Sequence, residues 1–227
     1  MDFDNLNNIQ TEYTEESFDI ERFIDEMEIS DEQKDNRKEL AQELSLALMF
    51  LFALVREQMN YYGYIDYAIL YNRFKGKFEP IVLKYARNDE YIQTYVDKAS
   101  NDIINTTINR AALDTAIIVG AMQAEESNTD FWLSQERADI VAANEANTIL
   151  NYEELQEAVD EGKTKKQWVT MHDRRVRHTH RQIDGKTIDI DEFFQVGDVQ
   201  LMIPRDEVND WTGGEETANC RCTLRFY

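Results

Sequence analysis

The sequence is poor in cysteine and in the residues that form turns. Its 227 residues include eight glycines, two prolines (Pro80 and Pro204) and two cysteines. So few turn formers argue against a β-sandwich or barrel with many turns. Cys220 and Cys222 stand one residue apart, too close to staple a fold, so nothing indicates a secreted scaffold held by disulfides.

The sequence also lacks a long hydrophobic run. The longest one, Leu44 to Val55, is about half of the roughly 20 residues that a membrane span needs. The first 26 residues are acidic and have no apolar stretch of the kind found in signal peptides. Since 42% of the residues are hydrophobic, a core is available without a membrane. We therefore expect a soluble intracellular protein with no membrane partner.

Positive charge is scarce except in one place. The chain has 24 Lys and Arg against 45 Asp and Glu, a net charge of −21. This balance argues against a protein that is basic overall and coats nucleic acid. The segment from Lys163 to Lys186, called the basic segment below, reverses it with eight bases and two acids. Its candidate phosphate ligands are Lys163, Lys165, Lys166, Arg174 and Arg181.

Hydrophobic periodicity predicts an α+β protein with three regions: a flexible acidic arm (1–30), a helical body (31–162) and a compact α+β unit with a short sheet (163–227). A short helix near Phe23 would dock the arm on the body or on a partner. Ser30 and Gln33 fit a capping box that starts a helix reaching about Asn60. Further helices are expected over 65–74, from Pro80, over 91–124, 131–150 and 152–162, and strands over 166–171, 186–190, 199–203 and 220–226.

The C-terminal third carries a dense motif in a fixed order. Glu145 lies on a predicted helix and is followed by Lys165-Lys-Gln-Trp168. Next come Asp173-Arg-Arg-Val-Arg177-His-Thr-His180 and Asp184-Gly185, and the motif ends with Asn219-Cys-Arg-Cys222. Over roughly residues 100–227 this order resembles the phage minor head proteins of the Mu F type, the phage head morphogenesis family.

The resemblance implies a virion protein present in few copies and associated with the portal. Its implied partners are the portal protein, the major capsid or scaffold proteins and, through the basic segment, packaged DNA. Its implied location is the capsid interior, and the host cytoplasm during assembly, with a role in head assembly, packaging or ejection. The resemblance implies no catalytic reaction, and we expect no cofactor. The motif residues that it marks as structural are Glu145, Trp168, Asp173, Arg175, Arg177, His180, Gly185, Asn219, Cys220, Arg221 and Cys222.

The charged residues of this motif predict which side chains form ion pairs in the folded chain. Asp173 is expected to form a salt bridge with a neighbouring arginine. Glu145 lies on the apolar side of its helix and needs a partner there, so we expect it to pair with an arginine of the 173–177 stretch. The alternative for Glu145 is a solvated glutamate. Trp168 and Trp211 are expected to be core aromatics rather than stacking platforms for bases.

Two chemical alternatives remain open. His178, His180, Cys220 and Cys222 have the composition of a tetrahedral zinc site, although both pairs have a shorter spacing than usual. The other interpretation of these residues is a hydrogen-bonded His180 near a buried, reduced Cys220. A small nuclease or toxin-like enzyme is the second alternative, with His180 as base beside Asp173, Arg174 and Arg177. A Cys220 nucleophile activated by His180 is a variant of that hypothesis.

Overall fold

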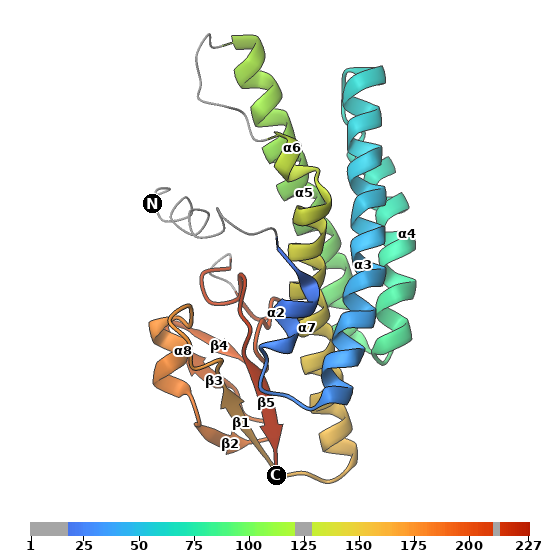
Figure 1. Cartoon of the computed structure of the whole chain (residues 1–227). Helices are drawn as coiled ribbons and strands as arrows, with labels where there is room; N and C mark the ends of the chain where they lie inside the picture. Colours follow the sequence, from blue (N-terminus) through green and yellow to red (C-terminus); the bar gives the residue numbers. More distant parts are fainter. Residues whose placement is uncertain (1–17, 121–128, 211–213) are drawn as a thin grey trace.

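The long helices run side by side, and two small sheets pack against one end of them (Figure 1). This computed structural model describes residues 18–120, 129–210 and 214–227, and gives the backbone alone for 112–120 and 129. The α+β class predicted from the sequence is confirmed. The predictions for the arm before residue 18 and for Trp211 lie outside the described residues.

The N-terminal helices form as their caps predict. Helix α2 (Ile20–Asp25) is capped by Asp19 and buries Phe23 and Ile24. Helix α3 (Asp31–Glu57) starts at the predicted capping box, in which both the Ser30 and the Gln33 side-chain bonds are present. It continues as a π-helical turn, η1 (Gln58–Tyr62), that ends at Gly63 in the left-handed region with φ +68°. The predicted break around residues 61–64 is therefore confirmed.

Helix α4 (Tyr67–Tyr85) is continuous, so the predicted interruption at Gly76 and the new helix at Pro80 are wrong. The reason lies on its two faces. Phe74, Phe78 and Val82 recur every four residues and are all buried. Pro80 has no N–H, so the Gly76 carbonyl lacks its helical hydrogen-bond partner. Both residues are exposed, and that carbonyl is therefore open to hydrogen bonding with water. Packing of the apolar face thus outweighs the two breakers.

The remaining helices agree with the predictions in part. Helix α5 (Glu90–Gly120) leads to the short α6 (Thr129–Trp132) and to α7 (Gln135–Asp160). The prediction of two helices in place of α7 is wrong, because its polar residues near position 151 are buried rather than in a turn. Gly162 follows the helix with φ +79°, which agrees with its predicted role as the terminating residue.

The C-terminal part contains a three-stranded sheet and a hairpin. Strand β1 (Lys165–Val169) lies between β2 (Thr187–Asp189) and β5 (Thr223–Phe226), and both pairings are antiparallel. Strands β3 (Phe194–Val196) and β4 (Val199–Leu201) form the hairpin, with Val196 opposite Val199. Helix α8 (His178–Ile183) and β3 were not predicted, whereas the other four strands overlap the predicted ranges.

One hydrophobic core connects these parts. It extends from Leu44 and Leu51 of α3 through Ile149 of α7 to Trp168 and Phe194 beside the sheets. The short helix α2 contributes Phe23 and Ile24 to the same core. The proposed boundary between a helical body and an α+β unit at residue 163 stays a prediction. None of the described helices has the length and hydrophobicity needed to span a bilayer.

Candidate functional site

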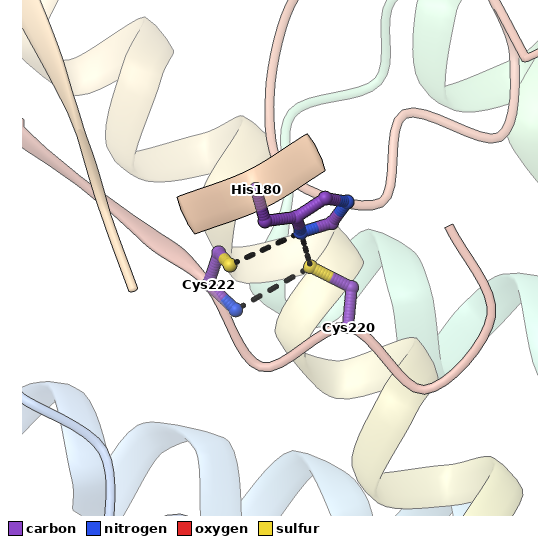
Figure 2. A group of neighbouring side chains, drawn as sticks. All are labelled: His180, Cys220 and Cys222. Carbon is purple, nitrogen blue, oxygen red and sulfur yellow. Dashed lines mark hydrogen bonds between the residues drawn. The ribbon is translucent and has the colours of Figure 1, made fainter. Parts of the chain in front are cut away.

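Two sulfur atoms and one imidazole nitrogen meet in the interior of the C-terminal part. His180 Nδ1 lies 3.4 Å from Cys222 Sγ and 3.5 Å from Cys220 Sγ (Figure 2). His180 comes from α8, and the cysteines come from the segment that leads into β5. In the described part of the chain no other group of His, Cys, Asp and Glu side chains brings three ligand atoms so close together.

The far side of the His180 ring faces a carboxylate. Glu216 Oε2 is 3.2 Å from His180 Nε2 and also accepts a hydrogen bond from the Thr179 hydroxyl at 2.7 Å. The carboxylate lies off the N–H direction, so His180 Nε2 lacks a well-formed hydrogen bond. Gly197 in the β3–β4 turn makes room for Glu216, because a Cβ there would lie 2.4 Å from Glu216 Oε1.

Trp168 packs edge-on against the His180 ring, with the ring centroids 5.4 Å apart and the planes at 87°. Its side chain is completely buried, which confirms the prediction of a core aromatic. Among the described residues the indole N–H makes no well-formed hydrogen bond. Since its neighbours are His180 and Cys222, the indole N–H is a spare donor beside the sulfur atoms.

Hydrogen bonds within the group shift the pKa values of the two thiols in opposite directions. Burial raises the pKa of Cys220, but hydrogen bonds from Cys222 and His180 outweigh it, so the pKa lies well below the usual range. The hydrogen bond to Cys220, followed by burial, raises the pKa of Cys222. Burial lowers the pKa of His180, but the hydrogen bond and charge of Cys220 raise it further. The group therefore favours a Cys220 thiolate beside a protonated His180.

The depth of this group limits its chemistry. His180 and Cys220 are 1% and 2% exposed, so neither can reach a polynucleotide or another large substrate. The hypotheses of a His180-centred nuclease and of a Cys220 nucleophile are not supported by this geometry. His178 is exposed and hydrogen-bonded to Gln182, so only three of the four predicted zinc ligands come together.

A second polar group joins the helices to the C-terminal part around Glu145. Its Oε1 accepts a hydrogen bond from Arg205 Nη2 at 3.0 Å, and its Oε2 accepts one from the Tyr95 hydroxyl at 2.5 Å. The predicted pairing of Glu145 with the 173–177 stretch is therefore wrong. Arg205 satisfies it better because its other donors are also used, by Thr148, Asn144 and the Thr217 carbonyl.

Arg205 also forms an ion pair with a second carboxyl group, that of Glu207, whose Oε1 lies 2.5 Å from the same Nη2. Burial, together with the negative charge of Glu145, raises the pKa of Glu207 to about 8. One guanidinium therefore faces two carboxyl groups. Burial and the charge of Glu145 also raise the pKa of Tyr95 well above its ordinary value, which keeps its hydroxyl a donor.

Asparagines on α7 bridge α3 and the cysteine segment. Asn147 accepts a hydrogen bond from Arg37 and donates to the carbonyls of Cys220 and Cys222 at 3.4 and 3.2 Å. Asn151 likewise accepts from Arg37 and donates to the Cys222 carbonyl at 3.3 Å. Arg37 is completely buried and also pairs with Glu154. These contacts fix the backbone that carries the two sulfur atoms.

The Asp173 region is a surface ion-pair network. The predicted local salt bridge is confirmed, because Arg175 Nε lies 3.3 Å from Asp173 Oδ2. Arg221 also pairs with Asp173, and both arginines pair with Glu26, which fastens the end of α2. Arg177 donates to the Ala218 carbonyl, and Asn219 Oδ1 accepts from Asn144 at 3.1 Å. Gly185 has φ +71° and donates its amide to the Trp168 carbonyl.

The basic segment does not act as one surface. Lys163, Arg174 and Arg181 are exposed and have no ion pair among the described residues. Lys165 is exposed but pairs with Asp189. The prediction of Lys166 as a phosphate ligand is wrong, because its side chain is completely buried and its Nζ donates to the Met202 carbonyl at 2.9 Å. Burial lowers the pKa of Lys166 to about 8.

Several residues of these networks were missed by the sequence-based predictions. They are Arg37, Tyr95, Asn144, Asn147, Asn151, Arg205, Glu207 and Glu216. One signal was available: Asn144, Asn147 and Asn151 have the spacing of one helix face and interrupt an apolar run. Nothing local marked Arg205, which follows Pro204 and has a left-handed φ of 61°.

Comparisons with known proteins give one family and one relative. The model of the family described as Phage Mu protein F like protein matches residues 96–225. NAD(+)–arginine ADP-ribosyltransferase EFV of Enterococcus faecalis (strain ATCC 700802 / V583) is 28% identical over 144 residues. That alignment covers 60% of this chain but 28% of the Enterococcus protein, so the chain spans little more than a quarter of that relative. No solved structure matches.

Proposed function

The chain belongs to the phage Mu protein F-like family, and is therefore a phage head morphogenesis protein; we propose that it is a minor head protein built into the virion beside the portal protein. The single observation that carries this proposal is the extent of the family match, from near the start of α5 through α7 to β5. That stretch contains the His180–Cys220–Cys222 group and the Glu145–Arg205 pair described above.

A structural role agrees with how polar groups are used in the matched region. Glu145, Arg205 and Asn147 are buried and hold parts of this chain to one another. His180, the best candidate for a catalytic base, is buried as well. The transferase activity in the name of the Enterococcus relative is not assigned to this chain, because the alignment leaves most of that relative unmatched.

We place the protein inside the capsid, after assembly in the host cytoplasm, with the portal and the major capsid or scaffold proteins as partners. The test is the composition of purified particles of the encoding phage. We expect the chain in virions and procapsids by mass spectrometry, and we expect a tagged full-length chain to retain coexpressed portal protein. Absence from both particles would overturn the virion role. Presence in particles without portal binding would overturn the portal contact alone.

We further propose that Lys163, Arg174 and Arg181 lie near packaged DNA. Because they are exposed and without ion partners among the described residues, they are available to phosphates. Binding to a duplex of arbitrary sequence should be weak and should fall steeply with salt. Changing all three to Gln should reduce the slope of log K against log salt by about 2.7, at roughly 0.9 for each phosphate contact.

The matched control for this experiment is Lys98→Gln, which removes one partly exposed lysine outside the basic segment. Its salt slope should equal that of the wild-type chain. An unchanged slope in the triple variant would remove DNA from the list of partners, while leaving the particle experiment unaffected.

A further inference from the structure

The spacing of His180, Cys220 and Cys222 matches the edges of a metal coordination polyhedron. Zinc bonds of about 2.3 Å to sulfur and about 2.0–2.1 Å to nitrogen, in tetrahedral geometry, place ligand atoms roughly 3.5–3.8 Å apart. The two distances from His180 Nδ1 to the sulfur atoms are 3.4 and 3.5 Å. All three ligand atoms lie within 4.8 Å of one another.

We propose that His180 Nδ1, Cys220 Sγ and Cys222 Sγ bind one Zn²⁺ ion, with a water molecule as the fourth ligand. Zinc is the metal of choice because thiolates and imidazole together are its preferred ligands in tetrahedral sites. Binding releases two protons to solvent, that of the Cys222 thiol and that of the protonated His180 Nδ1, and the two thiolates then neutralise the charge of the ion. A neutral centre is what a buried location requires.

A small cavity beside the three ligand atoms offers the fourth position. A cavity of about 20 Å³ is lined by the three ligands together with Met171, Arg177 and Asn219, among others. Such a volume holds one water molecule, for which about 10–15 Å³ is sufficient. The neighbouring His178 cannot take this position in the present conformation, because it is exposed and bonded to Gln182.

The surroundings supply the contacts that support metal ligands. A zinc-bound histidine usually presents its second ring nitrogen to a carboxylate, and here Glu216 lies 3.2 Å from His180 Nε2. The Cys222 amide donates to Cys220 Sγ at 3.4 Å. Within the described ranges the buried Trp168 N–H makes no well-formed hydrogen bond, and the adjacent Cys222 sulfur would be a stronger acceptor for it as a thiolate. The Trp168 N–H thus lies beside a proposed ligand sulfur, and Glu216 lies on the opposite side of the His180 ring.

The first experiment is a cobalt titration of the reduced, metal-free, full-length chain. One equivalent of Co²⁺ should produce a thiolate-to-cobalt charge-transfer band and the intense visible bands of a tetrahedral ion. One equivalent of Zn²⁺ should bleach both, and should raise the thermal unfolding midpoint. Absence of the charge-transfer band from the wild-type chain would overturn the proposal without the need for any variant.

Variants then assign the ligands. Cys222→Ser should reduce the charge-transfer intensity to about half and weaken zinc binding at least tenfold, whereas the control His178→Ala should leave both unchanged. Full intensity in folded Cys222→Ser, checked by circular dichroism, would overturn this ligand set. Glu216→Gln should keep the cobalt spectrum while weakening zinc roughly 10–100-fold, the usual effect of removing such a supporting contact. Unchanged zinc affinity would remove Glu216 from the site. The proposal does not depend on the virion role.

Discussion

Arg205 Nη2 lies 3.0 Å from Glu145 Oε1, and both side chains are less than a tenth exposed. The pair connects α7 to the loop that follows β4, across a distance of 60 residues in the sequence. Because either group alone would be a buried charge without compensation, the pair makes the packing of the helices and of the C-terminal part interdependent.

Breaking this pair should be strongly destabilising. Arg205→Met should lower the free energy of unfolding by about 3–5 kcal/mol, the effect of leaving a buried charge unpaired. The double variant Arg205→Met with Glu145→Leu should lose less than the sum of the single changes. Urea denaturation of the full chain measures all three. Lys98→Met, which removes an exposed pair with Asp102, is the control and should change stability by less than about 0.5 kcal/mol. If the loss of unfolding free energy in the double variant equalled the sum of the two single losses, Arg205 and Glu145 would not be energetically coupled.

Glu207 should make stability fall as the pH rises toward 8. Its pKa is raised from 4.5 to about 8 in the folded chain, so between these values the folded state holds a proton that the unfolded state has released. The free energy of unfolding therefore decreases with pH across that window. Glu207→Gln should remove this dependence and be more stable than the wild type at pH 8, with little difference near pH 4.5. The free energy of unfolding is measured by urea denaturation at several pH values. The same pH dependence in both proteins would contradict the role of Glu207.

Lys166 should act in the opposite direction at higher pH. Its pKa is lowered from 10.5 to about 8 on folding, so between these values the unfolded chain binds the extra proton and stability rises with pH. The slope should approach, at most, about 1.4 kcal/mol per pH unit for one proton. Lys166→Met should flatten the curve between pH 8 and 10.5, measured as the difference from the wild type. If the difference in unfolding free energy between variant and wild type did not change between pH 8 and 10.5, the Lys166 amine would be exposed to water rather than buried.

Gly197→Ala should disturb the support of His180. At φ +54°, alanine meets both backbone strain and the Glu216 carboxylate, so we expect a loss of about 2–3 kcal/mol. Gly162→Ala is the matched control, because it has φ +79° but nothing within 4 Å of the added Cβ. That control should lose about 1–2 kcal/mol from strain alone. Thermal unfolding of the two variants compares them, and an equal loss would argue against a close approach of Glu216.

The sequence predicted elements whose signals are local. The Ser30–Gln33 capping box and the Gly162 terminator depend on a few neighbouring residues, and both were found. The interruptions expected at Gly76 and Pro80 failed because the buried Phe74 and Phe78 decide the course of α4. A three-residue strand such as β3 is too short for its alternation to stand out.

The candidate site was predicted in composition but not in geometry. His180, Cys220 and Cys222 were identified together, since they belong to one motif. The partner of Glu145 was not, because Arg205 reaches it only through the folded chain and by a left-handed backbone that no neighbouring residue indicates. Asn151 fell at the predicted break between two helices, because polar residues on a helix ordinarily face water.

The bridging role of Asn147 and Asn151 has a mechanical consequence. A slide of α7 by one turn, about 5.4 Å, would bring Leu155 to the place of Asn151 and leave the Cys222 carbonyl without its amide donor. Intermediate shifts would break the contacts of both asparagines with Arg37 at the same time. Helix α7 is therefore locked in one register between α3 and β5. Under load along its axis, the matched region should transmit force as a stiff strut until it unfolds as a whole.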